Sequence, residues 1–294
     1  MRKSILFTLF ILSISFLNAA NLKPIAAKID TKIKAGVVFE NTNLFHISNA
    51  TKAYSNQLKD AVSESDVMQI DFSILTSLYQ QAPEALQLNI PLIDGNNKIL
   101  KLYKTTINAP DFNLYASSNP LQNLAYKGGV HYWGIVDGDI NSIAAISIFE
   151  NELMGLVTSS NEGNLVLGKL ENAPMGYYVF YNDKHLTKSN PSNCITADDN
   201  ISYASTDLQE PDRAIGDCIR LFWEVNFDIF TGKGSVVNAA NYVTGLFNQS
   251  AIVYANDGII VELSEVFVWN TASPYVATTT SGLLSQFQNY RNTI

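Results

Sequence analysis

Short segments of alternating apolar and polar residues, separated by turn residues, constrain this chain more than any other feature. Alternation with a period of two is typical of a strand that buries one face. Asp94-Gly95-Asn96-Asn97 separates the first two segments and predicts a β-hairpin. We therefore expect an all-β domain over residues 21–186, an antiparallel meander or sandwich that is mostly β from residue 86. The predicted strands are 86–93, 98–107, 130–136, 142–149, 153–159, 164–170 and 177–182.

The N-terminus, residues 1–20, has the pattern of a secretory signal peptide. Two basic residues precede an apolar segment, 5–17, and the small residues Ala19 and Ala20 follow at a plausible cleavage point. The apolar segment is shorter than the ~20 residues that a membrane-spanning helix needs. An uncleaved membrane anchor is the alternative. We expect the mature protein to be soluble and secreted.

Two stretches lack hydrophobic periodicity. From Asn21 to about Val67 the chain is polar and irregular, and one short helix is expected around Ala53–Val62. Residues 187–217 are polar and rich in turn residues, which predicts a linker between two domains.

After the linker the pattern changes to that of an α/β unit, residues 218–294. The sequence CIRLFWEVNFDIF (218–230) predicts a strand, and Ser235 is a suitable N-cap for an amphipathic helix. A second strand is predicted at 259–269 and a last helix from near Ser281. This order opens an α/β domain. Because two strands bury little surface, we expect residues 218–294 to be the truncated first part of a larger domain.

Charge and motifs exclude several function classes. The net charge of −8 argues against nucleic-acid binding, which usually needs a basic patch. His46, His131 and His185 lack the spacing of a metal motif, so we expect structural roles for them. Phosphate-binding, dinucleotide-binding and nucleophile-elbow motifs are absent from the sequence. The residues by themselves therefore indicate no active site.

Two segments resemble the adamalysin/reprolysin (ADAM-type) family of zinc metalloproteases, and bacterial secreted members in particular. HYWGIVDGDINSIAAISIFENELMGLV (131–157) is similar to the propeptide signature of that family. Residues 218–269 are similar to the start of its catalytic domain, with Asn241, Tyr254 and Trp269 at matching places. The matching propeptide residues are His131, Tyr132, Gly134, Val136, Gly138, Ser142, Ser147, Gly155 and Leu156.

The resemblance implies the precursor of a secreted metalloendopeptidase that hydrolyses peptide bonds in proteins. Its propeptide would keep the catalytic domain latent, and zinc would sit on an H-E-x-x-H-x-x-G-x-x-H helix downstream of Ile294. The glutamate of that helix would act as general base. The fragment alone should therefore be inactive, with no catalytic residue to assign. Glu224 is the nearest candidate for a calcium ligand that some family members carry on this strand.

Cys194 and Cys218 are the only cysteines, and three interpretations stay open. Cys194 is a possible cysteine-switch ligand to the zinc of the zymogen, because zinc favours thiolate and the linker precedes the mature domain. Alternatively, Cys194 and Cys218 form a disulfide, which export would permit. In the third interpretation, Cys218 pairs with a cysteine further along the full-length protein.

A function of a different class is a non-enzymatic extracellular β-rich module for binding or adhesion. Tyr132, Trp133, Tyr177 and Tyr178 would then form an exposed platform for a sugar. Aromatic residues on alternating strands are more often part of a core.

Overall fold

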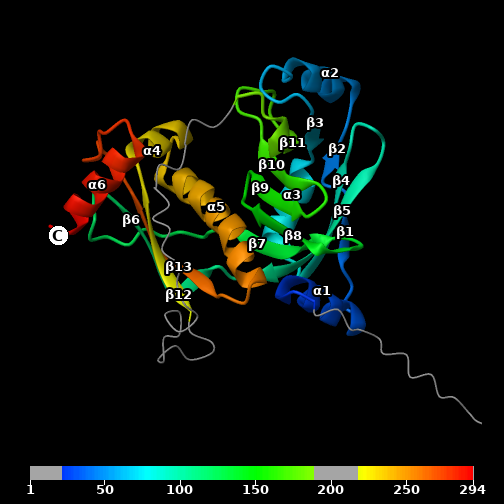
Figure 1. Cartoon of the computed structure of the whole chain (residues 1–294), viewed down its shortest axis with the longest axis horizontal. Helices are drawn as coiled ribbons and strands as arrows, with labels where there is room; N and C mark the ends of the chain where they lie inside the picture. Colours follow the sequence, from blue (N-terminus) through cyan, green and yellow to red (C-terminus); the bar gives the residue numbers. More distant parts are fainter. Residues whose placement is uncertain (1–21, 189–217, 294) are drawn as a thin grey trace, which may run out of the picture.

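Residues 22–188 and 218–293 are described by the computed structural model of this chain (Figure 1). Ten strands form one large curled sheet, in the order β1-β4-β5-β7-β8-β9-β10-β11-β3-β2. All neighbouring pairs are antiparallel except β1 and β4, so the sheet is mixed. The strands are β1 (Glu40–Thr42), β2 (Phe45–His46), β3 (Asp66–Ile70), β4 (Ala85–Pro91), β5 (Asn97–Thr105), β7 (Val130–Val136), β8 (Asp139–Ile148), β9 (Leu153–Ser159), β10 (Gly163–Lys169) and β11 (Tyr177–Asn182).

The prediction of a β-rich region is confirmed, but the region is not all-β. Three helices accompany the large sheet: α1 (Pro24–Lys34), α2 (Asn49–Gln57) and α3 (Phe72–Gln81). The expected helix at 53–62 begins earlier because Ser48 caps it, accepting a hydrogen bond from Thr51 N. Helix α3 was not predicted, although Asp71 marks its start by accepting from the backbone N–H groups of the first turn.

A second sheet has three parallel strands in the order β12-β13-β6. Strands β12 (Ile219–Val225) and β13 (Val261–Val268) were predicted, whereas β6 (Asn108–Ala116) was not. The first of these is shorter than the predicted 218–230, because Asn226 ends it and caps the next helix by accepting from Phe227 N. Ser235 caps a helix as predicted. The helices of this unit are α4 (Phe227–Lys233), α5 (Val236–Asn256) and α6 (Thr280–Arg291).

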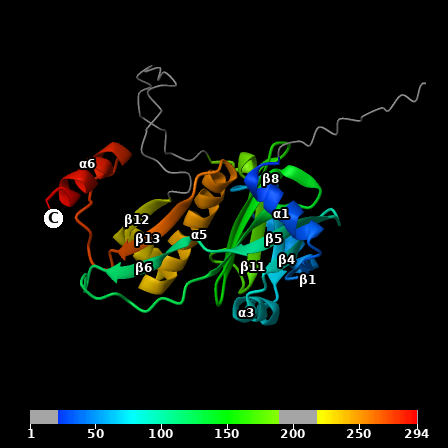
Figure 2. The ribbon, with the colours of Figure 1, turned by 90° about the horizontal axis from the view of Figure 1, so that it is seen from below.

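The third strand of the small sheet comes from the predicted N-terminal domain. Strand β6 lies between β5 and β7 in the sequence, yet β5 and β7 pair with each other in the large sheet. Figure 2 shows the small sheet on one side of α5 and the large sheet on the other side. Residues 218–293 therefore do not form their sheet alone, and the two predicted domains share a core.

Several predictions fall on residues outside the described part of the chain. These are the signal peptide at 1–20, almost all of the linker at 187–217, and Cys194. Within residues 22–188 and 218–293, no helix is long and apolar enough to cross a membrane.

Candidate functional site: the contact between the two sheets

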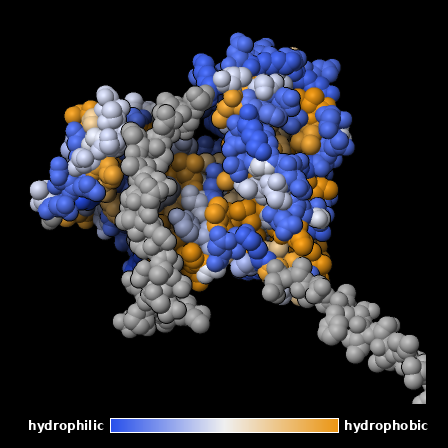
Figure 3. Space-filling model, in the orientation of Figure 1, coloured by the Kyte–Doolittle hydropathy of each residue, from blue (hydrophilic) through white to orange (hydrophobic). Residues whose placement is uncertain are grey.

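Helix α5 presents a different face to each sheet. Its apolar face, which includes Val243 and Phe247, packs against the buried side of β13, and Phe247 makes an edge-to-face contact with Trp223. Its opposite face, which includes Asn248 and Ile252, lies against the large sheet. Figure 3 shows hydrophobic residues between the two sheets and a mostly hydrophilic surface around α2. The buried contact between the sheets is thus built around α5.

A polar network joins α5 to the large sheet. Trp133 Nε1 donates to Asn248 Oδ1 at 2.7 Å, and Asn248 Nδ2 donates to Ser147 Oγ at 3.0 Å. The same Nδ2 lies 3.2 Å from the carbonyl oxygen of Ile146. Ser147 Oγ is 2.9 Å from Nδ1 of His131, which is completely buried. Because a charged ring is costly without water, burial lowers the pKa of His131 to about 3, so it is neutral here.

Helix α5 also approaches the large sheet closely through a glycine. A Cβ on Gly245 would lie 2.2 Å from Sδ of Met154 on β9, which is well inside van der Waals contact. A glycine in a helix interior normally weakens the helix, so it needs a packing reason. Here the reason is the close approach of α5 to β9.

An extended excursion of the chain, residues 107–129, makes the second contact between the sheets. We call this segment the arm. It leaves the large sheet after β5, adds β6 to the edge of β13, and turns back so that Leu124 N donates to Leu114 O at 2.8 Å. On the return, the Tyr126 hydroxyl donates to Asn241 Oδ1 on α5 at 2.9 Å. The arm then rejoins the large sheet at β7.

The residues that resemble the propeptide signature shape the strands β7, β8 and β9. Gly134 has no space for a side chain, because a Cβ would lie 1.9 Å from the carbonyl oxygen of Lys101 on β5. Gly138 has a φ of +83° in the turn between β7 and β8, which glycine adopts without strain. Ser142 Oγ accepts from Val136 N at 2.8 Å and fixes the same turn. These residues position His131 and Ser147 in the network on α5.

Glu224 holds α6 against the small sheet rather than facing open solvent. Its side chain is 6% exposed and accepts hydrogen bonds from Tyr275 OH at 2.6 Å, Arg291 Nε at 2.7 Å and Trp269 Nε1. The guanidinium already balances the carboxylate charge, which does not favour the expected calcium role. Beside it lies a cavity of about 450 Å³ whose walls include Phe222, Leu283, Leu284 and Phe287.

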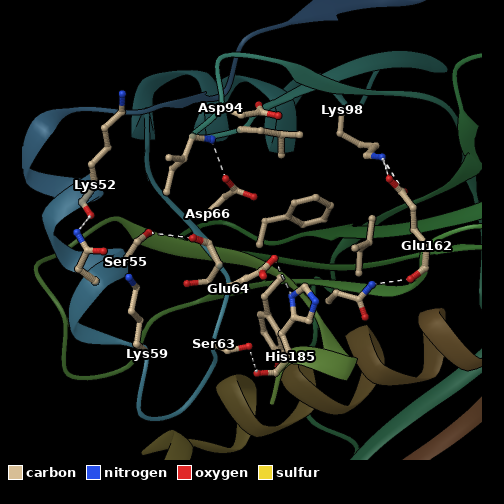
Figure 4. Close-up of a pocket in the computed structure, with 18 residues that line it drawn as sticks. Lys52, Ser55, Lys59, Ser63, Glu64, Asp66, Asp94, Lys98, Glu162 and His185 are labelled. Carbon is tan, nitrogen blue, oxygen red and sulfur yellow. Dashed lines mark hydrogen bonds and ion pairs between the residues drawn. The ribbon is translucent and has the colours of Figure 1, made fainter. Parts of the chain in front are cut away.

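A larger and more polar pocket, of about 690 Å³, lies in the N-terminal region (Figure 4). Lys98 pairs with Glu162 at 2.7 Å across it, and His185 Nδ1 lies 3.7 Å from Glu64. Asp66 accepts from Ile93 N at 2.7 Å, and burial raises the pKa of its carboxyl. In the described ranges, no three His, Cys, Asp or Glu side chains are grouped to hold a metal ion. The pocket therefore offers mixed charge without a catalytic arrangement.

The structure places only one of the two cysteines. Cys218 is exposed at the start of β12, and its Sγ lies 3.6 Å from Glu262 Oε2. That carboxylate and burial raise the pKa of the thiol, burial being the larger cause. Cys194 lies outside the described residues, so its pairing and its zinc role stay predictions.

The aromatic platform considered for a binding module is wrong. Tyr132, Tyr177 and Tyr178 are 0%, 8% and 1% exposed, and Trp133 is half-buried at α5. A sugar in solvent has no access to rings buried in this way. These residues are core and interface residues instead.

Sequence reasoning missed the arm and the network on α5. A signal for β6 was present, since Phe112, Leu114 and Ala116 alternate with polar residues, but Pro110 weakened it. Pro110 is tolerated because β6 is an edge strand. The partners of Asn248 had no signal in sequence spacing.

The fold is thus β-rich, with a large curled mixed sheet, a small parallel sheet and a helix between them. No family model matches the sequence, and no curated protein matches it.

Proposed function

We propose that this chain is the N-terminal part of the precursor of a secreted zinc-dependent metalloendopeptidase. Residues 22–188 would form the propeptide domain, and the catalytic domain would begin near Cys218. The signal-peptide pattern and the order of the two family-like segments support this proposal. In this reading the propeptide keeps the enzyme latent until it is removed.

One observation carries the proposal: the N-terminal region completes the sheet of the unit that follows it. The arm supplies the third strand beside β13, and α5 is packed between the two sheets. A propeptide must bind its own catalytic domain tightly and specifically, and such an interface does so through both backbone and side chains. The buried network of Asn248 adds specificity, because each of its polar groups needs its partner.

Zinc and its ligands belong to residues that this sequence does not contain. The family motif would lie downstream of Ile294, where zinc would polarise the scissile carbonyl and activate water. This chain would contribute the folding and the latency of the enzyme. It should therefore show neither proteolysis nor stoichiometric zinc when purified alone.

The cysteine alternatives separate in one measurement. Peptide mapping of the unreduced full-length zymogen by mass spectrometry would detect a cross-link between Cys194 and Cys218 if they form a disulfide. A free Cys194 that becomes reactive only after zinc is removed by a chelator would support the cysteine switch. A cross-link from Cys218 to a downstream cysteine would support the third interpretation.

The most direct test of the function is the full-length gene product. The coding sequence downstream of Ile294 should contain the zinc-helix motif, and the processed enzyme should cleave a protein substrate. A chelator should abolish that cleavage and zinc should restore it. A stop codon directly after Ile294 would contradict the proposal. It would leave the alternative, a non-enzymatic extracellular β-rich module, although the aromatic platform of that alternative is buried.

A further inference from the structure

The arm can leave the small sheet without disturbing the large one. Strands β5 and β7 pair directly, and Thr105 lies opposite His131 at the point where the chain departs and returns. The ladder continues from there to the pair Leu100 and Val136. Excursions of this length are uncommon in compact domains unless they have a function. The large sheet is therefore complete without residues 107–129.

The arm occupies an edge of β13 that is built to receive an extended chain. Its backbone pairs in parallel with β13 from Asn108 opposite Leu263 to Ala116 opposite Val268, with one irregularity between. Leu114 is 1% exposed and belongs to the core that α5 and β13 form. Backbone pairing of this kind supplies affinity, and pockets for alternate side chains supply selectivity.

The end of the arm strand is fixed by a set of specific hydrogen bonds. Ser117 Oγ accepts from the backbone N–H groups of Asn270 and Thr271, both at 3.1 Å. Ser118 N donates to Asn270 Oδ1 at 2.9 Å, and Asn270 Nδ2 donates to Ser118 Oγ at 2.8 Å. Nearer the start of the strand, Asp111 pairs with Arg220 of β12. These contacts set both the register and the direction of the bound strand.

One group in the arm opposes docking. Oδ1 of Asn108 is buried, and no residue of the described part donates a hydrogen bond to it. A buried acceptor without a partner loses its hydration for no return. The docked arm is thus held firmly at Ser117 and less well at its root.

We infer that the edge of β13, from Leu263 to Thr271, is a peptide-binding site, and that its ligand is an extended segment with the sequence of the arm supplied from outside the chain. The arm of this chain is the resident ligand, and a free peptide of the same sequence replaces it once it is gone. The inference identifies the segment by which the proposed propeptide holds its partner, so its biological meaning rests on the proposed function. The binding itself needs no protease activity.

The experiment uses the whole chain with the arm removed. Residues 107–129 are replaced by Asn-Gly, which closes a two-residue hairpin between Thr106 and Val130. A fluorescent peptide spanning residues 107–124 is then titrated and its anisotropy is measured. We expect saturable binding with one peptide per chain, and binding to the unaltered chain at least about tenfold weaker because its edge is occupied.

Matched peptides test the specificity of the site. Leu114→Asp in the peptide should abolish binding, because it places a charge in the core. Ser117→Ala combined with Ser118→Ala should weaken binding by about tenfold or more, since several hydrogen bonds are lost. Pro110→Ala is the control, because Pro110 is exposed, and it should change the affinity by no more than about twofold.

A second variant covers the case in which the shortened chain does not fold. Leu114→Asp in the full chain weakens the resident arm in place, so this variant should bind the unaltered peptide. The inference is overturned if neither variant binds the peptide saturably, or if the Leu114→Asp peptide binds as well as the unaltered one. The absence of a downstream zinc motif would refute the proposed function and would leave these results unchanged.

Discussion

Trp133 on β7 and Asn248 on α5 are joined by a 2.7 Å hydrogen bond from the indole Nε1 to the amide Oδ1. This contact links the N-terminal and C-terminal parts of the chain through a site that is mostly closed to water. Asn248 uses its amide nitrogen to reach Ser147 as well. The interface therefore depends on one side chain that satisfies several buried groups at once.

Asn248→Leu should destabilise the chain by about 2–4 kcal/mol, because it leaves the indole N–H and the Ser147 hydroxyl without this partner. The free energy of unfolding can be measured with urea by linear extrapolation. Ser250→Ala, an exposed change on the same helix, is the control and should cost no more than about 0.5 kcal/mol. Equal effects of the two substitutions would argue against the network.

His131 should make the interface sensitive to acid. Burial lowers the pKa of His131 from 6.5 to about 3, so between these values the unfolded chain binds a proton that the folded chain does not. Stability from this group is complete above pH 6.5 and is lost as the pH falls toward 3. We expect the free-energy difference between the unaltered chain and His131→Asn to change by about 1.4 kcal/mol per pH unit in that window.

The comparison with His131→Asn removes the contribution of carboxyl groups, which both chains share. Asn retains a polar group near the position of Nδ1, so the hydrogen bond to Ser147 can persist. Urea unfolding at pH 7 and pH 5 gives the difference directly. If both chains lose stability in parallel over this range, His131 titrates normally and is not buried as described.

Gly134→Ala should destabilise the large sheet by about 3 kcal/mol or more, because the new methyl group would collide with the backbone of Lys101. Gly168→Ala on β10 is a matched control, since a Cβ there meets no atom within 4 Å. The control should change the free energy of unfolding by no more than about 1 kcal/mol. Thermal or urea unfolding distinguishes the two, and a well-tolerated Gly134→Ala would contradict the register of β5 and β7.

Arg291→Gln should release α6 from the small sheet. Glu224 would lose its cation while it remains buried, which typically costs about 3–5 kcal/mol. Since α6 has no fully buried residue, the loss should appear as local opening. Hydrogen exchange of residues 280–291 should become faster, whereas Lys34→Gln, in an exposed pair with Asp30, should leave it unchanged. Unchanged exchange in Arg291→Gln would show that the ion pair does not hold the helix.

Local patterns in the sequence predicted most of the regular elements. Strands 130–136, 153–159 and 177–182 were predicted with the bounds that the structure has, because alternation and turn residues are local properties. The Ser235 cap was predicted for the same reason. Helix α1 was missed because the polar N-terminal stretch has a weak pattern.

The candidate site was hardly predictable, because it arises from contacts between distant segments. The pairing of β6 with β13 joins residues that are far apart in the sequence, and no local pattern encodes a partner. The family resemblance singled out His131 and Ser147, but their shared contact with Asn248 became visible only in the fold. Strand 218–230 was predicted too long because the cap at Asn226 was not recognised.

The central claim is that residues 22–188 bind the unit that begins at Cys218, and one measurement tests it directly. A specific protease site is inserted between residues 189 and 217, the folded chain is cut there, and size-exclusion chromatography follows both pieces. We predict that the pieces of the unaltered chain elute together and that the pieces of the chain lacking residues 107–129 separate more readily. Complete separation of the unaltered pieces under native conditions would contradict the account.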